Sequence, residues 1–178
     1  MERIKSFLSS ELFKSLITYI LIILVVVLIR VFLIDPFRVD GSSMDTTLSD
    51  GEIMILNKIV YRKNDIKRFD IVVINKGNKK IIKRVIGLPG EIIEYKDNKL
   101  YINGEEVEDP YPSTETDDFS ITNIGHTKIP GDSYFVMGDN RANSLDSRYN
   151  EVGVIKKDKI MGRARLVIWP FNKFGIVE

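Results

Sequence analysis

The chain has 178 residues, of which 44% are apolar, and its 26 basic and 25 acidic residues give a formal net charge of +1. This apolar fraction is typical of a folded protein, and the length allows one domain with an anchor. The balanced charge argues against a nucleic-acid partner, and the absence of cysteine excludes disulfides and thiol chemistry.

The first predicted element is the apolar run at residues 16–34. As an α-helix it would be about 28 Å long, close to the thickness of a bilayer's hydrocarbon core. A buried helix of a soluble protein would show a polar face, and residues 20–29 have none. A cleavable signal peptide would have a shorter apolar core followed by small residues, which are missing here. We therefore predict one uncleaved transmembrane helix.

The basic residues around this run predict its orientation. Those that bear on it are Arg3, Lys5 and Lys14 before the run, and Arg30 and Arg38 at or beyond its far end. The positive-inside rule favours a short cytoplasmic N-terminus at residues 1–15, an anchor at 16–34 and an extracytoplasmic domain at 35–178 in a cell membrane. The two arginines beyond the centre of the run oppose this orientation.

Beyond Pro36 the sequence is typical of an all-β, mostly antiparallel domain. Short segments rich in Val, Ile, Tyr and Phe lie between turn residues, and Asn103-Gly104 predicts a two-residue hairpin. One short helical turn is expected around residues 156–159, and the polar segment 109–127 is expected to be a surface excursion. The predicted strands are residues 69–75, 80–87, 90–95, 99–107, 133–139 and 163–170.

Candidate bases are scarce. His126 is the single histidine and lies in a polar loop, and no group of acidic residues and histidine has metal-ligand spacing, so we expect no metal and no other cofactor. Lys83 lies within a predicted strand, where Ile81 and Val85 share its face. Desolvation there would lower the pKa of its amine from about 10.4 and make it a base. The alternative, an exposed lysine whose stem covers apolar surface, is favoured on this segment alone.

The stretch GSSMDTTL at residues 41–48 contains two candidate nucleophiles, Ser42 and Ser43. A serine paired with a lysine base is a known variant of the catalytic triad. Taken alone, however, a Gly-Ser-Ser segment is more typical of a loop.

Three motifs occur in order behind the apolar run: GSSMDTTL, KRVIGLPGE and GDNRANSLDSR. A fourth segment, KRFDIVVI, lies between the first two. Together they resemble the conserved boxes of type I signal peptidases, the membrane-bound Ser/Lys endopeptidases that remove signal peptides from exported preproteins. The resemblance covers nearly the whole chain.

The resemblance implies a role for each matching residue. Ser43 is similar to the family's nucleophile, with Ser42 separated from it only by motif register, and Lys83 is similar to the general base. Ser144 matches the serine that orients the lysine amine. The family's structural cluster of alternating charges matches Asp139, Arg141, Asp146 and Arg148. The implied partners are signal peptides of secretory preproteins and the lipid bilayer.

Substrate recognition is expected to use added-strand pairing beside residues 37–40 and 80–83. The resemblance implies small residues at the positions one and three before the cut. The Ser43 backbone N–H is the expected oxyanion donor, whereas Gly41 lacks the hydroxyl donor that some relatives have there. Trp169, Phe171 and Phe174 are expected either to reach the membrane interface or to pack in the core.

Two residues depart from the family's serine box. Thr46 stands where the family usually has proline, which restores a backbone N–H and frees φ. Asp45 places a carboxylate near the candidate lysine, where it would raise the lysine pKa. These departures motivate an alternative function, a non-catalytic membrane-tethered module that binds extended peptides.

Overall fold

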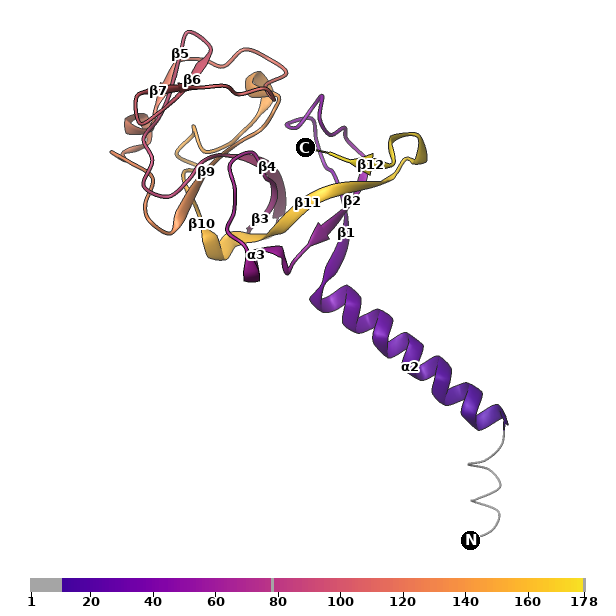
Figure 1. The fold of residues 1–178 in the computed structure, drawn as a ribbon. Helices are drawn as coiled ribbons and strands as arrows, with labels where there is room; N and C mark the ends of the chain where they lie inside the picture. Colours follow the sequence, from indigo (N-terminus) through magenta and orange to yellow (C-terminus); the bar gives the residue numbers. More distant parts are fainter. Residues whose placement is uncertain (1–10, 78, 178) are drawn as a thin grey trace.

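A computed structural model of the chain describes residues 11–77 and 79–177. A long helix, α2 (Glu11–Phe32), is followed by a body of short strands and brief helical turns (Figure 1). The strands are β1 (Ile34–Arg38), β2 (Ile53–Asn57), β3 (Ile71–Lys76), β4 (Lys79–Gly87), β5 (Ile93–Lys96), β6 (Lys99–Ile102), β7 (Glu105–Val107), β8 (Phe119–Ser120), β9 (Ser133–Met137), β10 (Ile155–Lys156), β11 (Ile160–Trp169) and β12 (Gly175–Ile176). The turns are α3 (Val60–Lys63), η1 (Ile121–Ile124), η2 (Arg141–Asn143), η3 (Lys157–Lys159) and η4 (Phe171–Lys173).

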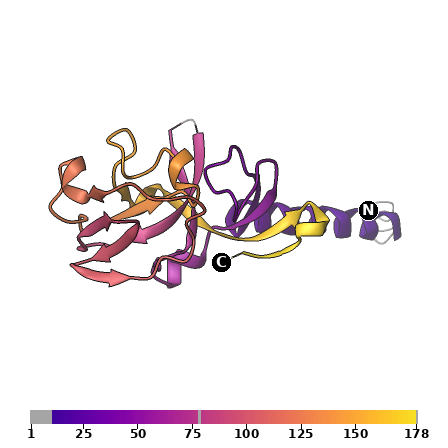
Figure 2. The same cartoon turned by 90° about the horizontal axis from the view of Figure 1, so that it is seen from above.

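Helix α2 extends away from one end of the β body, as the view from above shows (Figure 2). It is long and apolar enough to cross a membrane, and none of its apolar window is buried. The helix ends at Phe32, two residues before the predicted end of the apolar run. It cannot continue, because Ile34 already belongs to β1, where it pairs with Asn57 of β2. Pro36 lacks a backbone N–H and biases the preceding residue toward extended backbone, so the helix stops before it. Most of the predicted N-terminal segment 1–15 lies outside the described residues.

The strands form two sheets. The larger has the order β1-β2-β11-β3-β4-β9-β10, with β12 also paired to β11, and the smaller has the order β7-β6-β5-β8. All strand pairs in the described part of the chain are antiparallel. The prediction of an all-β, mostly antiparallel fold behind one apolar helix is confirmed.

The hairpin prediction at Asn103-Gly104 is also confirmed. Ile102 and Glu105 are opposite each other across the turn, and both turn residues have positive φ, 55° and 86°. A two-residue turn of this kind requires that backbone conformation, which asparagine and glycine tolerate. The predicted helical turn near residues 156–159 is present as η3.

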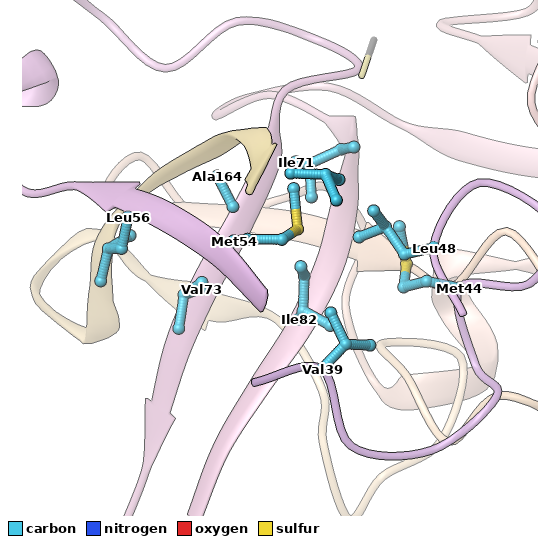
Figure 3. Packing of buried hydrophobic residues seen from close by; sticks show 10 residues of the cluster. Val39, Met44, Leu48, Met54, Leu56, Ile71, Val73, Ile82 and Ala164 are labelled. Carbon is cyan, nitrogen blue, oxygen red and sulfur yellow. The ribbon is translucent and has the colours of Figure 1, made fainter. Parts of the chain in front are cut away.

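One buried cluster connects the segment between β1 and β2 to the large sheet (Figure 3). Met44 and Leu48 from that segment are fully buried against side chains of β2, β3 and β4, among them Met54, Ile71 and Ile82. Burial of side chains of this size stabilises the fold by about 1.5–3 kcal/mol each. The segment that contains Ser43 is therefore held by its own apolar side chains.

The prediction of a surface excursion at residues 109–127 is only partly correct. The segment forms β8 and η1, and Ile121 and Thr116 are buried. The Tyr111 ring lies under the guanidinium of Arg84, 3.6 Å from its centroid. The polar composition of the segment misled the prediction, because polar side chains within it form hydrogen bonds to buried partners instead of to water.

Candidate active site

Ser43 lies in a tight turn after β1, and backbone hydrogen bonds between its neighbours hold this turn. The backbone N–H of Asp45 donates to the Ser42 carbonyl at 3.1 Å, and that of Leu48 donates to the Met44 carbonyl at 2.9 Å. Because Met44 and Leu48 are buried in the core, the turn is fixed against the sheet. Ser43 itself is only partly buried.

Lys83 reaches Ser43 from the middle of β4. Its Nζ donates to Ser43 Oγ at 2.6 Å, although the two residues are 40 positions apart in the chain. The lysine is only 4% exposed. Burial lowers the pKa of Lys83 to about 8, with Asp146 and Asp139 opposing the shift and Arg148 adding to it. A measurable fraction of this amine is therefore neutral near pH 7, which is what a general base requires.

The other serine of the pair has a different partner. The Ser42 hydroxyl accepts a hydrogen bond from Asn143 Nδ2 at 2.8 Å. The geometry thus brings Ser43, and not Ser42, to the lysine amine.

Ser144 is buried near this pair, but its predicted hydrogen bond to Lys83 does not form here. Its Oγ has no hydrogen-bond partner within the described residues. It lies close to Gly138, where a Cβ would collide with both Ser144 Oγ and the Ser43 carbonyl oxygen. Glycine at this position therefore lets the loop after β9 approach the serine turn. The lysine-orienting role of Ser144 stays a prediction.

The four residues of the predicted charge cluster are buried or nearly so. Their ion-pair partners include residues outside the motif, which was not expected. Only Asp146 and Arg148 pair with each other, at 2.9 Å. The Arg148 guanidinium also donates to the Arg141 carbonyl at 2.6 Å. The other two find partners outside the motif: Arg141 pairs with Asp109 at 2.7 Å, and Asp139 is paired with Arg84.

Sequence reasoning missed Arg84 as a structural residue. Its guanidinium makes two bonds to the Asp139 carboxylate, at 2.9 and 2.7 Å, with both side chains fully buried. Thr47 donates to the same carboxylate at 2.6 Å and so ties the serine turn to it. The available signal was the position of Arg84, directly after Lys83 in a predicted strand with apolar neighbours.

The two departures from the family's serine box do not disrupt the pair. The charges that act on the Lys83 pKa are those of Asp139, Asp146 and Arg148, whereas the sequence pointed to Asp45. The Asp45 carbonyl accepts a hydrogen bond from the Ser113 hydroxyl, and the Asp45–Thr46 peptide bond is cis. The contact between Ser43 and Lys83 does not favour the non-catalytic alternative.

A groove of about 610 Å³ runs beside the pair. Its lining includes Asp40, Ser43, Lys83 and residues 79–82. A smaller cavity of about 60 Å³ adjoins the same segments and is lined by Phe37, Arg38, Val39, Asp40, Val73, Lys80, Ile81 and Ile82. The two segments expected to border a substrate, 37–40 and 80–83, thus share the walls of one groove with a small, partly apolar pocket. No group of side chains suited to hold a metal ion occurs in the described residues.

The fold and the site together define a class: an antiparallel β protein behind a candidate membrane helix, with a serine hydroxyl set against a buried lysine amine beside a strand-lined groove. A family model described as signal peptidase, peptidase S26, matches residues 11–169, and the chain belongs to this family. The resemblance stated from the motifs is therefore confirmed.

Individual relatives agree with this assignment. The chain is 47% identical over 142 residues to signal peptidase I T of Bacillus subtilis strain 168, covering 75% of this chain and 73% of the relative. It is 44% identical over 140 residues to a signal peptidase I of Bacillus amyloliquefaciens, covering 75% of each. A crystal structure of a signal peptidase I from Enterococcus faecalis V583 superimposes with a TM-score of 0.51 at 36% identity, covering 56% of this chain and 97% of that one.

Proposed function

We propose that this protein is a membrane-anchored signal peptidase, a serine endopeptidase that removes N-terminal signal peptides from exported preproteins after small residues. The observation that carries the proposal is the 2.6 Å contact between the Ser43 hydroxyl and the buried Lys83 amine. The curated names of the relatives support the substrate class.

The first chemical step is acylation of Ser43. Neutral Lys83 takes the Ser43 hydroxyl proton as Oγ attacks the scissile carbonyl, which gives a tetrahedral oxyanion and an ammonium. The ammonium then gives its proton to the leaving amine as the C–N bond breaks. The mature protein departs with a free amino group, and the signal peptide remains as an ester on Ser43.

Hydrolysis of the ester repeats the same proton path. Neutral Lys83 takes a proton from a water molecule as its oxygen attacks the ester carbonyl. The proton returns to Ser43 Oγ when the C–O bond breaks, which restores both groups and releases the signal peptide as a carboxylic acid that then loses its proton to water.

The oxyanion needs preorganised donors, and the Ser43 backbone N–H is one candidate. No group in the described residues accepts a hydrogen bond from it, which leaves this donor available to an oxyanion. Gly41 has no side chain, and a second donor is unassigned.

Peptide binding follows from the groove. An extended chain lying between residues 37–40 and 80–83 can bond to strand backbone on either side. The adjoining small pocket, lined in part by Phe37, Val73 and Ile82, is the candidate site for a small side chain of the substrate. Backbone pairing tolerates many sequences, so the pocket supplies the selectivity for small residues.

The helix is the proposed anchor in a cell membrane. With the N-terminus cytoplasmic, the domain from residue 35 onward lies outside the cytoplasm. Enzyme and signal peptide then share one bilayer, which raises their effective concentration.

A preprotein cleavage assay tests the proposal. Wild-type protein in vesicles should produce a shortened product that begins directly after a small residue, and Ser43→Ala and Lys83→Met should each abolish the product. Ser42→Ala is the matched control and should retain cleavage, since its hydroxyl contacts Asn143. Wild-type-like turnover by Ser43→Ala or Lys83→Met would reject the pair as the catalytic groups.

A further inference from the structure

Asn140, in the loop after β9, holds the main chain on both sides of Ser43. Its backbone N–H donates to the Ser43 carbonyl at 3.1 Å. Its side-chain Nδ2 donates to the Ser42 carbonyl at 3.2 Å. These carbonyls belong to successive peptide units, one entering Ser43 and the other leaving it.

The geometry of a peptide unit links this contact to the reaction. A trans peptide is planar, and its C=O and N–H point in opposite directions. The Ser42–Ser43 bond is trans, since the cis bonds in the described residues lie elsewhere. A donor that holds the Ser42 carbonyl on one side therefore aims the Ser43 N–H toward the other.

We propose that Asn140 is a positioning residue for the oxyanion, because its side-chain amide sets the direction of the Ser43 N–H. The inference rests on the proposed function, since an oxyanion forms only if Ser43 attacks a carbonyl. A hydrogen bond to the carbonyl also polarises the N–H of the same peptide unit and strengthens it as a donor.

The Ser42 carbonyl has a second donor, the Asp45 backbone N–H at 3.1 Å. That bond lies within the serine turn and moves with it. Asn140 belongs to a different segment, held by the packing of Gly138 against Ser43 and by the bond from the Gly138 N–H to Asp146 at 3.1 Å. Asn140 therefore fixes the position of the serine turn relative to β9. The bond from Asp45 cannot do this, because both of its partners lie within the turn.

Asn143 provides a matched control in the same loop. Its amide also donates to Ser42, but to the hydroxyl, at 2.8 Å. Removal of that bond leaves the peptide unit and its two donors in place.

The test is steady-state cleavage of a preprotein by the full-length protein in vesicles, comparing wild type, Asn140→Ala, Asn140→Asp and Asn143→Ala. Loss of an oxyanion donor itself costs about 10²–10³ in kcat, and we expect a misaimed donor to cost about tenfold. KM should stay within about twofold for Asn140→Ala, since the oxyanion exists only in the transition state. Asn143→Ala should keep kcat within about twofold of wild type.

Two further readouts separate positioning from general damage. The pH midpoint of kcat/KM should be the same for Asn140→Ala and wild type, because Lys83 remains the base. The inhibition constant of a substrate-like peptide aldehyde, whose adduct carries the oxyanion, should weaken in parallel with kcat/KM. Asn140→Asp keeps the side-chain volume but loses the donor, so it reports on the same bond if Asn140→Ala does not fold.

The outcomes distinguish this inference from the proposed function. An unchanged kcat in a folded Asn140 variant, or a rise in KM alone, would overturn the positioning role while wild-type cleavage leaves the peptidase assignment intact. Absence of cleavage by wild-type protein would instead reject the proposed function itself.

Discussion

Lys83 experiences two opposed influences on its pKa. Burial lowers the pKa, whereas the carboxylates of Asp146 and Asp139 raise it. Asp139 is itself bonded to Arg84, and Asp146 to Arg148. Arg148 opposes the effect of the two carboxylates on the Lys83 pKa, so the charge cluster has an electrostatic effect on the base as well as a structural one.

The first prediction concerns the pH dependence of cleavage. The Lys83 amine must be neutral to accept the serine proton, and its pKa is lowered to about 8. We expect kcat/KM to rise about tenfold per pH unit from pH 6 and to level off near pH 8. Initial rates at low substrate concentration measure this profile. A rate that is flat between pH 6 and 8 would show that a different group is the base.

The second prediction concerns the arginine beside the base. Arg148→Gln leaves the buried Asp146 carboxylate without its ion-pair partner, and Arg148 itself lowers the Lys83 pKa. The midpoint of the profile should therefore move to higher pH, and the free energy of unfolding should fall by about 3–5 kcal/mol.

Arg68→Gln is the control for that shift. It breaks a partly buried ion pair, Arg68–Glu91 at 2.6 Å, whose members are not among the charges that act on the Lys83 pKa. Its profile should keep the wild-type midpoint. A shift of equal size in both variants would mean that general destabilisation moves the midpoint.

At the scale of elements, local pattern predicted the strands that alternate or are densely apolar. The segments at 69–75, 80–87 and 99–107 correspond to β3, β4 and the β6–β7 hairpin. β1 (Ile34–Arg38) was missed because it continues the apolar run and contains Pro36, which is tolerated since β1 is at the edge of its sheet. No local signal marked this edge strand.

Long-range pairing could not be predicted from local pattern. Ser43 and Lys83 were brought together only by the family resemblance, since charge and periodicity do not relate positions 40 residues apart. The same holds for Asp109 and Arg141, which are 32 residues apart and lie in what the sequence indicated was a surface loop. A polar segment looks solvated until its buried partner is known.

The third prediction tests the Asp109–Arg141 contact. Asp109→Asn leaves the Arg141 guanidinium, 0% exposed, without its countercharge. We expect the free energy of unfolding to fall by about 3–5 kcal/mol in denaturant titrations. Lys99→Gln, which breaks an exposed ion pair in the small sheet, should leave the denaturant concentration at the unfolding midpoint unchanged. Equal midpoints for wild type and Asp109→Asn would mean that the segment 109–118 is not fastened by this pair.

At the scale of the whole molecule, the helix and the C-terminal aromatics lie at opposite ends of the same strands. Ile34, next to the helix, is aligned with Asn57 and Arg163, whereas Arg38 is aligned with Ile53 and Trp169. The five residues of β1 separate these ends by about 14 Å. Trp169 can therefore reach the bilayer surface only if the strands lie nearly flat on it.

The exposure of the aromatics favours the flat orientation. Trp169, Phe171 and Phe174 are 48%, 75% and 64% exposed, which excludes core packing, one of the two alternatives that the sequence left open. Rings of this kind are stabilised at the membrane interface relative to water. A flat orientation also brings the serine turn, which follows Arg38, toward the surface from which a signal peptide emerges.

The fourth prediction measures this orientation through the single tryptophan of the chain. In vesicles whose lipids carry brominated acyl chains, Trp169 fluorescence should be strongly quenched and shifted to the blue of its emission in water. A Trp169→Phe protein carrying Tyr101→Trp places the reporter on β6, at the other end of the body (Figure 1), where quenching should be absent. Water-like emission from Trp169 without quenching would mean that the strands stand upright on the anchor. The serine turn would then lie away from the bilayer, and a substrate would have to extend well beyond the surface to reach it.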